Sequence, residues 1–131
     1  MVTMLQDNTE YFSQPLFSSL FRELSRGIEK ESFRVNYDSS PALTPHPDSL
    51  GASLTHKFIT TDYGEAQMEF ITPVCNSPEE VLGVMNDIHR HVYHNLEKEL
   101  LWSASMPCTI EDEHDVQLAR YGSSESGRKK N

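Results

Sequence analysis

The sequence predicts an α+β fold in which a mostly antiparallel sheet packs against one long helix. Three segments rich in β-branched and aromatic residues precede one stretch with clear helical periodicity, and turn-forming residues separate them. The 131 residues suffice for one domain, but a hydrophobic share of 37% is low for a compact globule. We therefore expect a small hydrophobic core whose stability depends on contacts with a partner or with further sequence.

The first predicted elements are short. Residues 18–25 carry apolar side chains at helical spacing, and Gly27 ends that pattern. Residues 28–35 form a predicted strand. Residues 36–53 are a long polar connection with three prolines, and so long a loop is more often functional than idle. Residues 54–61 form a second predicted strand.

Residues 65–72 form the third predicted strand, and the clearest helix follows it. Ser77 is a good N-cap, Pro78 occupies the first helical position, and Glu80 completes a capping box. A single apolar stripe follows, made of Val81, Met85, Ile88, Val92 and Leu96. We expect this helix to run to about Leu101 and to pack across the sheet.

The charge balance excludes one class of partner. Acidic residues outnumber basic ones by 20 to 11, for a formal net charge of −9. Nucleic-acid binding needs clustered Lys and Arg, so we expect no nucleic-acid partner. No apolar run approaches the roughly 20 residues of a membrane span, and the polar N-terminus is no secretory signal, so we expect no membrane partner. Two cysteines, Cys75 and Cys108, are too few for a disulfide framework, which predicts reduced thiols in the cytoplasm.

Acidic residues on the predicted strands form the candidate functional site. Residues two apart on a strand share a face, about 6.6 Å apart along it, so Glu29 and Glu31 point the same way. Like charges so placed repel each other unless a cation lies between them. Carboxylate oxygens are ligands for hard divalent cations. The spacing therefore fits a metal site, if a cation is present.

The third strand adds a second acidic group. Glu65, Gln67 and Glu69 are expected to point one way, with apolar residues on the opposite face. If the strands pair, Glu69 and Asp62 come near the first two carboxylates. Acids on the outer face of an antiparallel strand are, however, usually just solvated, and spacing alone leaves that interpretation in place.

The histidines of the long helix and Cys108 are not expected to form a functional site. His89, His91 and His94 fall on the long helix, where no acid or cysteine matches them as zinc ligands, so a solvated helix face is favoured. Cys108 is expected to be a buried structural thiol.

Several motifs together resemble one family. The run GIEKESFRV at residues 27–35 matches G-[IL]-E-x-E-x-x-R-V, the signature of glutamate–cysteine ligases. Further matching runs follow in register at residues 54–63, 69–74, 89–90, 101–102, 105–108 and 118–122. Each motif is moderately specific, but their order and spacing are strongly so. From about residue 26 to 130 the chain resembles the N-terminal part of a bacterial glutamate–cysteine ligase.

The resemblance implies a glutamine-synthetase-like carboxylate–amine ligase fold and the first reaction of glutathione biosynthesis. In that reaction ATP phosphorylates the γ-carboxylate of glutamate, and the cysteine amine displaces phosphate. Magnesium is the implied cofactor. Glu29, Glu31, Asp62 and Glu69 match family positions that bind the metal or closely support its ligands. The resemblance assigns no catalytic or nucleotide-binding residue in this sequence.

Family members are several times longer, so residues 1–131 are expected to be an incomplete N-terminal segment of the catalytic domain. Residues 122–131 are expected to form a flexible tail, in which Glu125 stands where the family has Asn. The expected partners are glutamate, cysteine, ATP and the missing C-terminal part of the enzyme. Two alternatives stay open: a non-catalytic remnant that binds magnesium or a partner, and a related ligase that uses another amine.

Overall fold

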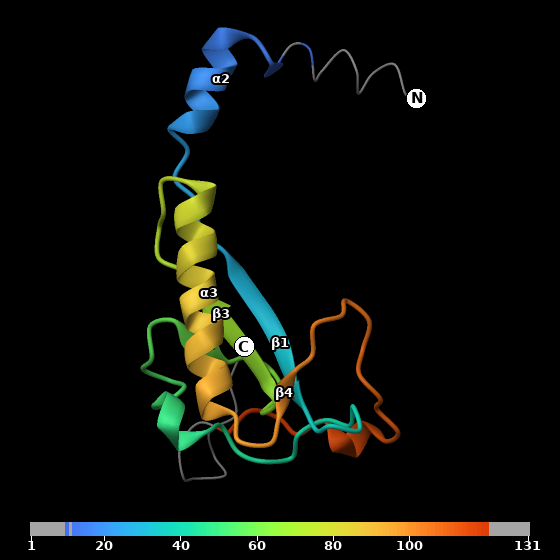
Figure 1. Ribbon diagram of the computed structural model, residues 1–131. Helices are drawn as coiled ribbons and strands as arrows, with labels where there is room; N and C mark the ends of the chain where they lie inside the picture. Colours follow the sequence, from blue (N-terminus) through green and yellow to red (C-terminus); the bar gives the residue numbers. More distant parts are fainter. Residues whose placement is uncertain (1–9, 11, 121–131) are drawn as a thin grey trace.

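The computed structural model describes residue 10 and residues 12–120, and it confirms the predicted α+β arrangement (Figure 1). The tail at residues 122–131, with Glu125, lies outside the described residues. The described elements are, in chain order, α2 (Pro15–Arg22), β1 (Glu29–Val35), the 3₁₀ helix η1 (Asp48–Leu50), β2 (Ile59–Thr61), β3 (Gln67–Ile71), α3 (Pro78–Asn95), β4 (Leu100–Leu101) and the 3₁₀ helix η2 (Glu113–Asp115).

Four of these elements form one antiparallel sheet in the order β2-β3-β1-β4. The central pair is β1 and β3, in a register that sets Glu31 opposite Glu69. A short strand flanks each side of this pair: β2 pairs with β3, and the two residues of β4 pair with the end of β1. The register between β1 and β3 therefore decides which side chains lie next to each other on the sheet.

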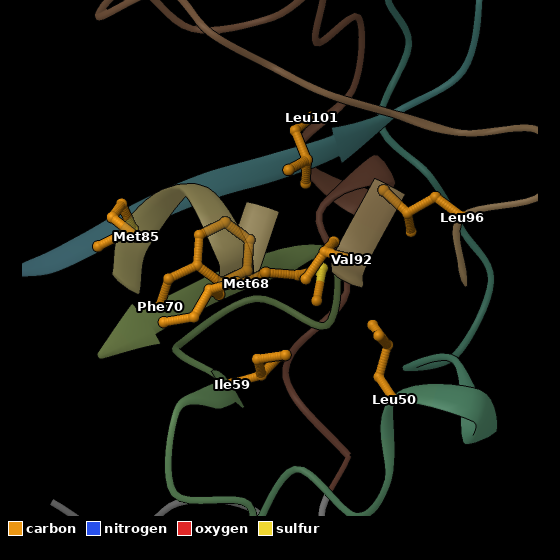
Figure 2. Close-up of a cluster of buried hydrophobic side chains, with 9 residues drawn as sticks. Leu50, Ile59, Met68, Phe70, Met85, Val92, Leu96 and Leu101 are labelled. Carbon is orange, nitrogen blue, oxygen red and sulfur yellow. The ribbon is translucent and has the colours of Figure 1, made fainter. Parts of the chain in front are cut away.

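The core lies between this sheet and α3. The whole predicted stripe is buried, and its members from Met85 to the C-cap residue Leu96 pack in one cluster with Met68 and Phe70, the buried face of β3 (Figure 2). The helix begins as predicted: the Ser77 hydroxyl accepts the Glu80 N–H at 3.1 Å. The Glu80 carboxylate instead accepts the N–H of Asn76 at 2.7 Å, one residue before the N-cap. The first bond satisfies a donor that the first helical turn leaves unpaired, and the second holds the residue before the N-cap.

The helix α3 ends at Asn95, so the predicted extension to about Leu101 is wrong. Leu96 leaves the helical conformation with φ −91° and ψ 99° and stays buried in the core. Beyond it, Leu100–Leu101 pairs with β1 as β4. Pairing with an open strand edge satisfies the backbone there, which outweighs the helical pattern of the sequence.

The strand predicted at residues 54–61 is shorter than expected, because only Ile59–Thr61 is extended. A turn precedes it: the N–H groups of Thr55 and His56 both donate to the carbonyl of Ala52 at 3.0 Å. The His56 ring nitrogen Nδ1 then accepts the N–H of Ile59 at 2.9 Å. These local bonds compete with strand pairing and delay its start.

The first described helix, α2, starts at Pro15 and ends at Arg22, earlier than the predicted residues 18–25. It extends past the N-terminal end of α3, away from the sheet (Figure 1), and none of its residues is buried. The Arg26 guanidinium donates to the carbonyls of Phe21 at 3.0 Å and Asn76 at 3.1 Å, which ties α2 to the start of α3. Of the helices that the structure describes, none is long and apolar enough to cross a membrane.

Candidate metal centre

The sheet face opposite α3 carries the acidic residues. Along β3, Met68 and Phe70 are fully buried toward the helix, while Gln67 and Glu69 are half-buried on the other face. Glu31 of β1 lies directly opposite Glu69. Directly opposed residues have Cβ atoms about 4.5–5.5 Å apart, so these two carboxylates share one location.

The other two predicted ligands flank this pair. Glu29 lies opposite Ile71, one step further along the same face of β1, and is exposed. Asp62 directly follows β2, and its backbone N–H donates to the Gln67 carbonyl at 2.9 Å. The structure therefore brings Glu31 and Glu69 together and places Asp62 and Glu29 on either side.

Gln67 is the residue whose role the sequence reasoning missed. Its amide nitrogen Nε2 donates to Glu31 Oε2 at 2.5 Å and lies 3.3 Å from Asp62 Oδ2. Strand alternation did place Gln67 on the acidic face. The bridging role depends on the register between β1 and β3, which the sequence does not reveal.

Glu65 does not share the acidic face, and that prediction is wrong. It precedes β3 and is only 3% exposed. Its carboxylate accepts the backbone N–H of His46 at 2.8 Å and that of Arg120 at 2.5 Å. The turn before β3, closed by the Gln67 N–H on the Gly64 carbonyl at 2.9 Å, takes Glu65 out of the strand alternation. Glu65 thus joins the long loop to the end of the described chain.

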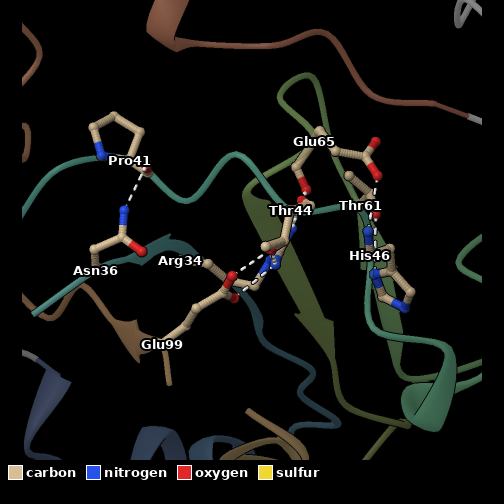
Figure 3. A network of polar contacts seen from close by, with 8 residues as sticks. All are labelled: Arg34, Asn36, Pro41, Thr44, His46, Thr61, Glu65 and Glu99. Atoms are coloured by element: carbon tan, nitrogen blue, oxygen red, sulfur yellow. Dashed lines mark hydrogen bonds and ion pairs between the residues drawn. The ribbon is translucent and has the colours of Figure 1, made fainter. Parts of the chain in front are cut away.

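A second polar cluster surrounds Arg34 on the helix side of β1 (Figure 3). Arg34 is completely buried and forms an ion pair with Glu99 at 2.7 Å. Its guanidinium also donates to the hydroxyl of Thr44 at 2.7 Å, to the Thr44 carbonyl at 2.8 Å and to the Glu65 carbonyl at 3.2 Å. Thr44 donates in turn to the Glu99 carboxylate. The cluster fixes the long loop against the sheet.

The histidines and cysteines do not form metal sites in the described part of the chain. His91 and His94 are exposed on α3, as predicted, whereas His89 is half-buried with its ring against Phe70 at 5.1 Å. Cys75 and Cys108 are buried and unpaired. Burial raises the pKa of both thiols, which keeps them in the neutral form that binds metals poorly.

The donor set on the sheet fits magnesium in one particular way. Across residues 10 and 12–120, no group of three or more His, Cys, Asp or Glu side chains is arranged to hold a metal ion by itself. Glu31 and Glu69 nevertheless present hard oxygen donors from two paired strands. Mg²⁺ usually keeps several waters and binds through one or two carboxylates plus substrate phosphates. The pair therefore offers two of the oxygen ligands that a Mg²⁺ ion takes from protein.

The fold is that of the carboxylate–amine ligases. One solved structure that it matches is a glutamate–cysteine ligase from Francisella tularensis in complex with AMP, with a TM-score of 0.72 and 35% identity over 76% of this chain and 20% of that one. Another is a bifunctional glutathione synthetase from Pasteurella multocida, with a TM-score of 0.73 and 37% identity over 78% of this chain and 14% of that one.

The chain belongs to the glutamate–cysteine ligase family, whose family model matches residues 9–131. The glutamate–cysteine ligases of Serratia proteamaculans (strain 568) and Sodalis glossinidius (strain morsitans) are 53% and 51% identical to it over 107 residues, or 82% of this chain. The matched region is 21% of each relative, so the chain spans about a fifth of their length.

Proposed function

We propose that this chain supplies the magnesium-binding carboxylates of an enzyme that joins the γ-carboxylate of glutamate to the amine of cysteine at the expense of ATP. This is the first step of glutathione biosynthesis. The observation that carries the proposal is the pairing of Glu31 with Glu69 on the sheet face opposite the core, in a chain of this family. The AMP bound to the Francisella ligase supports ATP as the nucleotide substrate.

The chemistry explains why such a face is needed. A carboxylate is a poor electrophile, so a γ-carboxylate oxygen of glutamate first attacks the terminal phosphorus of ATP and ADP leaves. The cysteine nitrogen then attacks the acyl phosphate carbon, phosphate leaves, and the nitrogen loses a proton. Bound magnesium supplies charge neutralisation on the phosphate oxygens. Glu31 and Glu69 would hold that ion, with Glu29 and Asp62 beside them.

We infer that the rest of the active site is formed by ligase segments other than the described residues. The described residues provide a sheet face and carboxylates, and we assign them no cysteine pocket or nucleotide base contact. We therefore expect the 131-residue chain to be inactive alone and to need the remaining segments of a ligase as its partner. The reaction is expected in the cytoplasm, where Cys75 and Cys108 would stay reduced.

A chimera tests the proposal. Residues 12–120 replace the corresponding segment of the Serratia ligase, and γ-glutamylcysteine formation is followed as Mg²⁺ is varied. We expect an active chimera, and we expect Glu31→Gln with Glu69→Gln to raise the Mg²⁺ concentration needed for half-maximal rate. Glu79→Gln, at an exposed acid on α3, is the matched control. An unchanged Mg²⁺ requirement in the double variant would contradict the proposal.

The same chimera distinguishes the alternatives. A folded chimera without activity, next to an active Serratia enzyme, would favour a non-catalytic remnant. Product formation with another amine in preference to cysteine would favour a related ligase.

A further inference from the structure

We propose that Gln67 is a positioning residue that holds two metal-binding carboxylates, Glu31 and Asp62, toward one point. The inference deepens the proposed function and rests on it. Gln67 is neither an acid nor a metal ligand in this arrangement, because its amide nitrogen, not its oxygen, faces the carboxylates.

The hydrogen bonds determine the orientation of the amide. A backbone N–H can only donate, and the N–H of Gly64 lies 3.4 Å from Gln67 Oε1. Ionised carboxylates can only accept, and Glu31 Oε2 and Asp62 Oδ2 lie 2.5 Å and 3.3 Å from Nε2. Reversing the amide would set oxygen against oxygen and N–H against N–H. The contacts of Oε1 and of Nε2 are therefore both satisfied only when Nε2 faces the two carboxylates.

The topology makes Gln67 the meeting point of three strands. Glu31 is on β1 and Asp62 follows β2, and these two strands each pair with β3 but not with each other. Gln67 lies opposite Phe33, so Glu31 is its diagonal neighbour. Diagonal neighbours are about 7–8 Å apart, a gap that a long side chain can bridge. The Gln67 backbone carbonyl also accepts the Asp62 N–H at 2.9 Å, so backbone and side chain hold the same residue.

A neutral donor suits this position better than a charged one. The amide reduces the repulsion between two carboxylates, and it leaves their full charge available to a cation. A Lys at this position would cancel one charge and compete with the metal. Each carboxylate has about four lone-pair positions, so accepting one N–H leaves it able to bind a cation. Outer partners of this kind commonly orient metal ligands.

Manganese binding tests the inference on the chimera with the Serratia ligase, whose other segments can supply the metal ligands that the described residues lack. Mn²⁺ replaces Mg²⁺ because free and bound Mn²⁺ are distinguished by electron paramagnetic resonance. Gln67→Met keeps the length of the side chain and removes its amide. We expect this variant to bind Mn²⁺ about 10- to 100-fold more weakly. Gln14→Met is the matched control, because Gln14 is exposed at the start of α2, away from the sheet, and its side chain forms no cap hydrogen bond; it should bind like the unchanged chimera.

A double variant separates positioning from a general structural effect. If Gln67 acts through Glu31, then Gln67→Met should weaken binding much less when Glu31→Gln is already present. Equal effects of Gln67→Met in both backgrounds, or unchanged Mn²⁺ affinity in the single variant, would overturn the inference.

A readout without metal keeps the two proposals distinguishable. The side-chain amide protons of Gln67 should shift in the NMR spectrum when Glu31→Ala removes the acceptor, and Glu79→Ala should leave them unchanged. A chimera that binds no Mn²⁺ contradicts the proposed metal site, and the Gln67 resonance of the 131-residue chain then still decides whether Gln67 holds the carboxylates. An unchanged resonance in Glu31→Ala overturns the inference alone.

Discussion

Arg34 shows how a single buried charge organises a small domain. Its guanidinium has no solvent exposure, and burying an ion without a partner costs several kcal/mol. Glu99 supplies the counter-charge, and Thr44 and the Glu65 carbonyl accept further N–H groups. These partners come from the long loop, from the turn before β3 and from the segment before β4. The family motif of the sequence includes Arg34, but the partners are visible only in the fold.

Removal of Glu99 tests this dependence. Glu99→Ala leaves the Arg34 charge buried without its counter-ion, and we expect a loss of about 3–5 kcal/mol in the free energy of unfolding. Chemical denaturation measures it. Glu97→Ala, at an exposed acid two residues earlier, should change the stability by no more than about 0.5 kcal/mol. Equal stabilities of the two variants would show that the ion pair is dispensable.

His46 gives the stability a pH dependence. Burial, helped by the nearby positive charge of Arg34, lowers the pKa of His46 below its usual range. The unfolded chain therefore takes up the proton at a higher pH than the folded chain, and the stability from neutral His46 is lost as the pH falls below about 6.5. We expect His46→Gln to lose less stability than the unchanged chain between about pH 7.5 and pH 5.5. Denaturation at both pH values measures the difference, and His91→Gln should retain the original dependence.

At the scale of elements, the sequence predicted the buried faces of α3 and β3 correctly. It did not predict the residues at which α3 ends and β2 begins, because specific contacts decide them. The stripe of α3 and the alternation of β3 each follow from one face being buried. The early end of α3 depends on β4 pairing with β1, and the late start of β2 depends on the His56 ring capping a turn. Both are contacts between specific groups. The hydrophobic periodicity of the sequence contains no information about these contacts.

The N-cap of α3 was predicted correctly and can be tested directly. Ser77→Ala removes the acceptor for the Glu80 N–H, and we expect a loss of about 1 kcal/mol in the free energy of unfolding. Thermal or chemical denaturation monitored by circular dichroism measures it. Ser105→Ala, at an exposed loop position, provides the baseline. A difference below about 0.3 kcal/mol between the two would show that the cap contributes little.

At the scale of the whole molecule, the chain presents surfaces that a lone domain usually covers. The helix α2 buries none of its residues, and Leu16 and Leu20 are 67% and 54% exposed. The two residues of β4 pair only with the last two residues of β1, so most of that edge of β1 is not covered by another strand of the described residues. Open strand edges and exposed apolar faces favour association. The low hydrophobic content of the sequence had already indicated a fold that depends on neighbouring protein.

We therefore predict that the isolated chain self-associates. Sedimentation velocity should show a weight-average mass that rises with protein concentration, and Leu16→Gln with Leu20→Gln should reduce the rise. Leu43→Gln, at an apolar residue that is 54% exposed on the long loop, is the control. A monomer at all concentrations, with one cooperative unfolding transition, would contradict the prediction.

The candidate site was predictable as a set of residues but not as an arrangement. Strand alternation placed Glu29 and Glu31 on one face, and the family resemblance supplied the interpretation as metal ligands. The direct opposition of Glu31 and Glu69 and the bridging amide of Gln67 required the strand register. Glu65 was misplaced because a turn, not a strand, determines its direction.

The most direct test of the central claim locates a bound ion on the sheet. Mn²⁺ broadens the NMR resonances of nuclei close to it, so a titration of the 131-residue chain maps where the ion binds. We predict broadening centred on the backbone amides of Glu31 and Glu69, and its loss in the Glu31→Gln, Glu69→Gln double variant. Broadening centred instead on the acidic segment at residues 111–115, or unchanged in the double variant, would contradict the claim that this sheet face is the metal site.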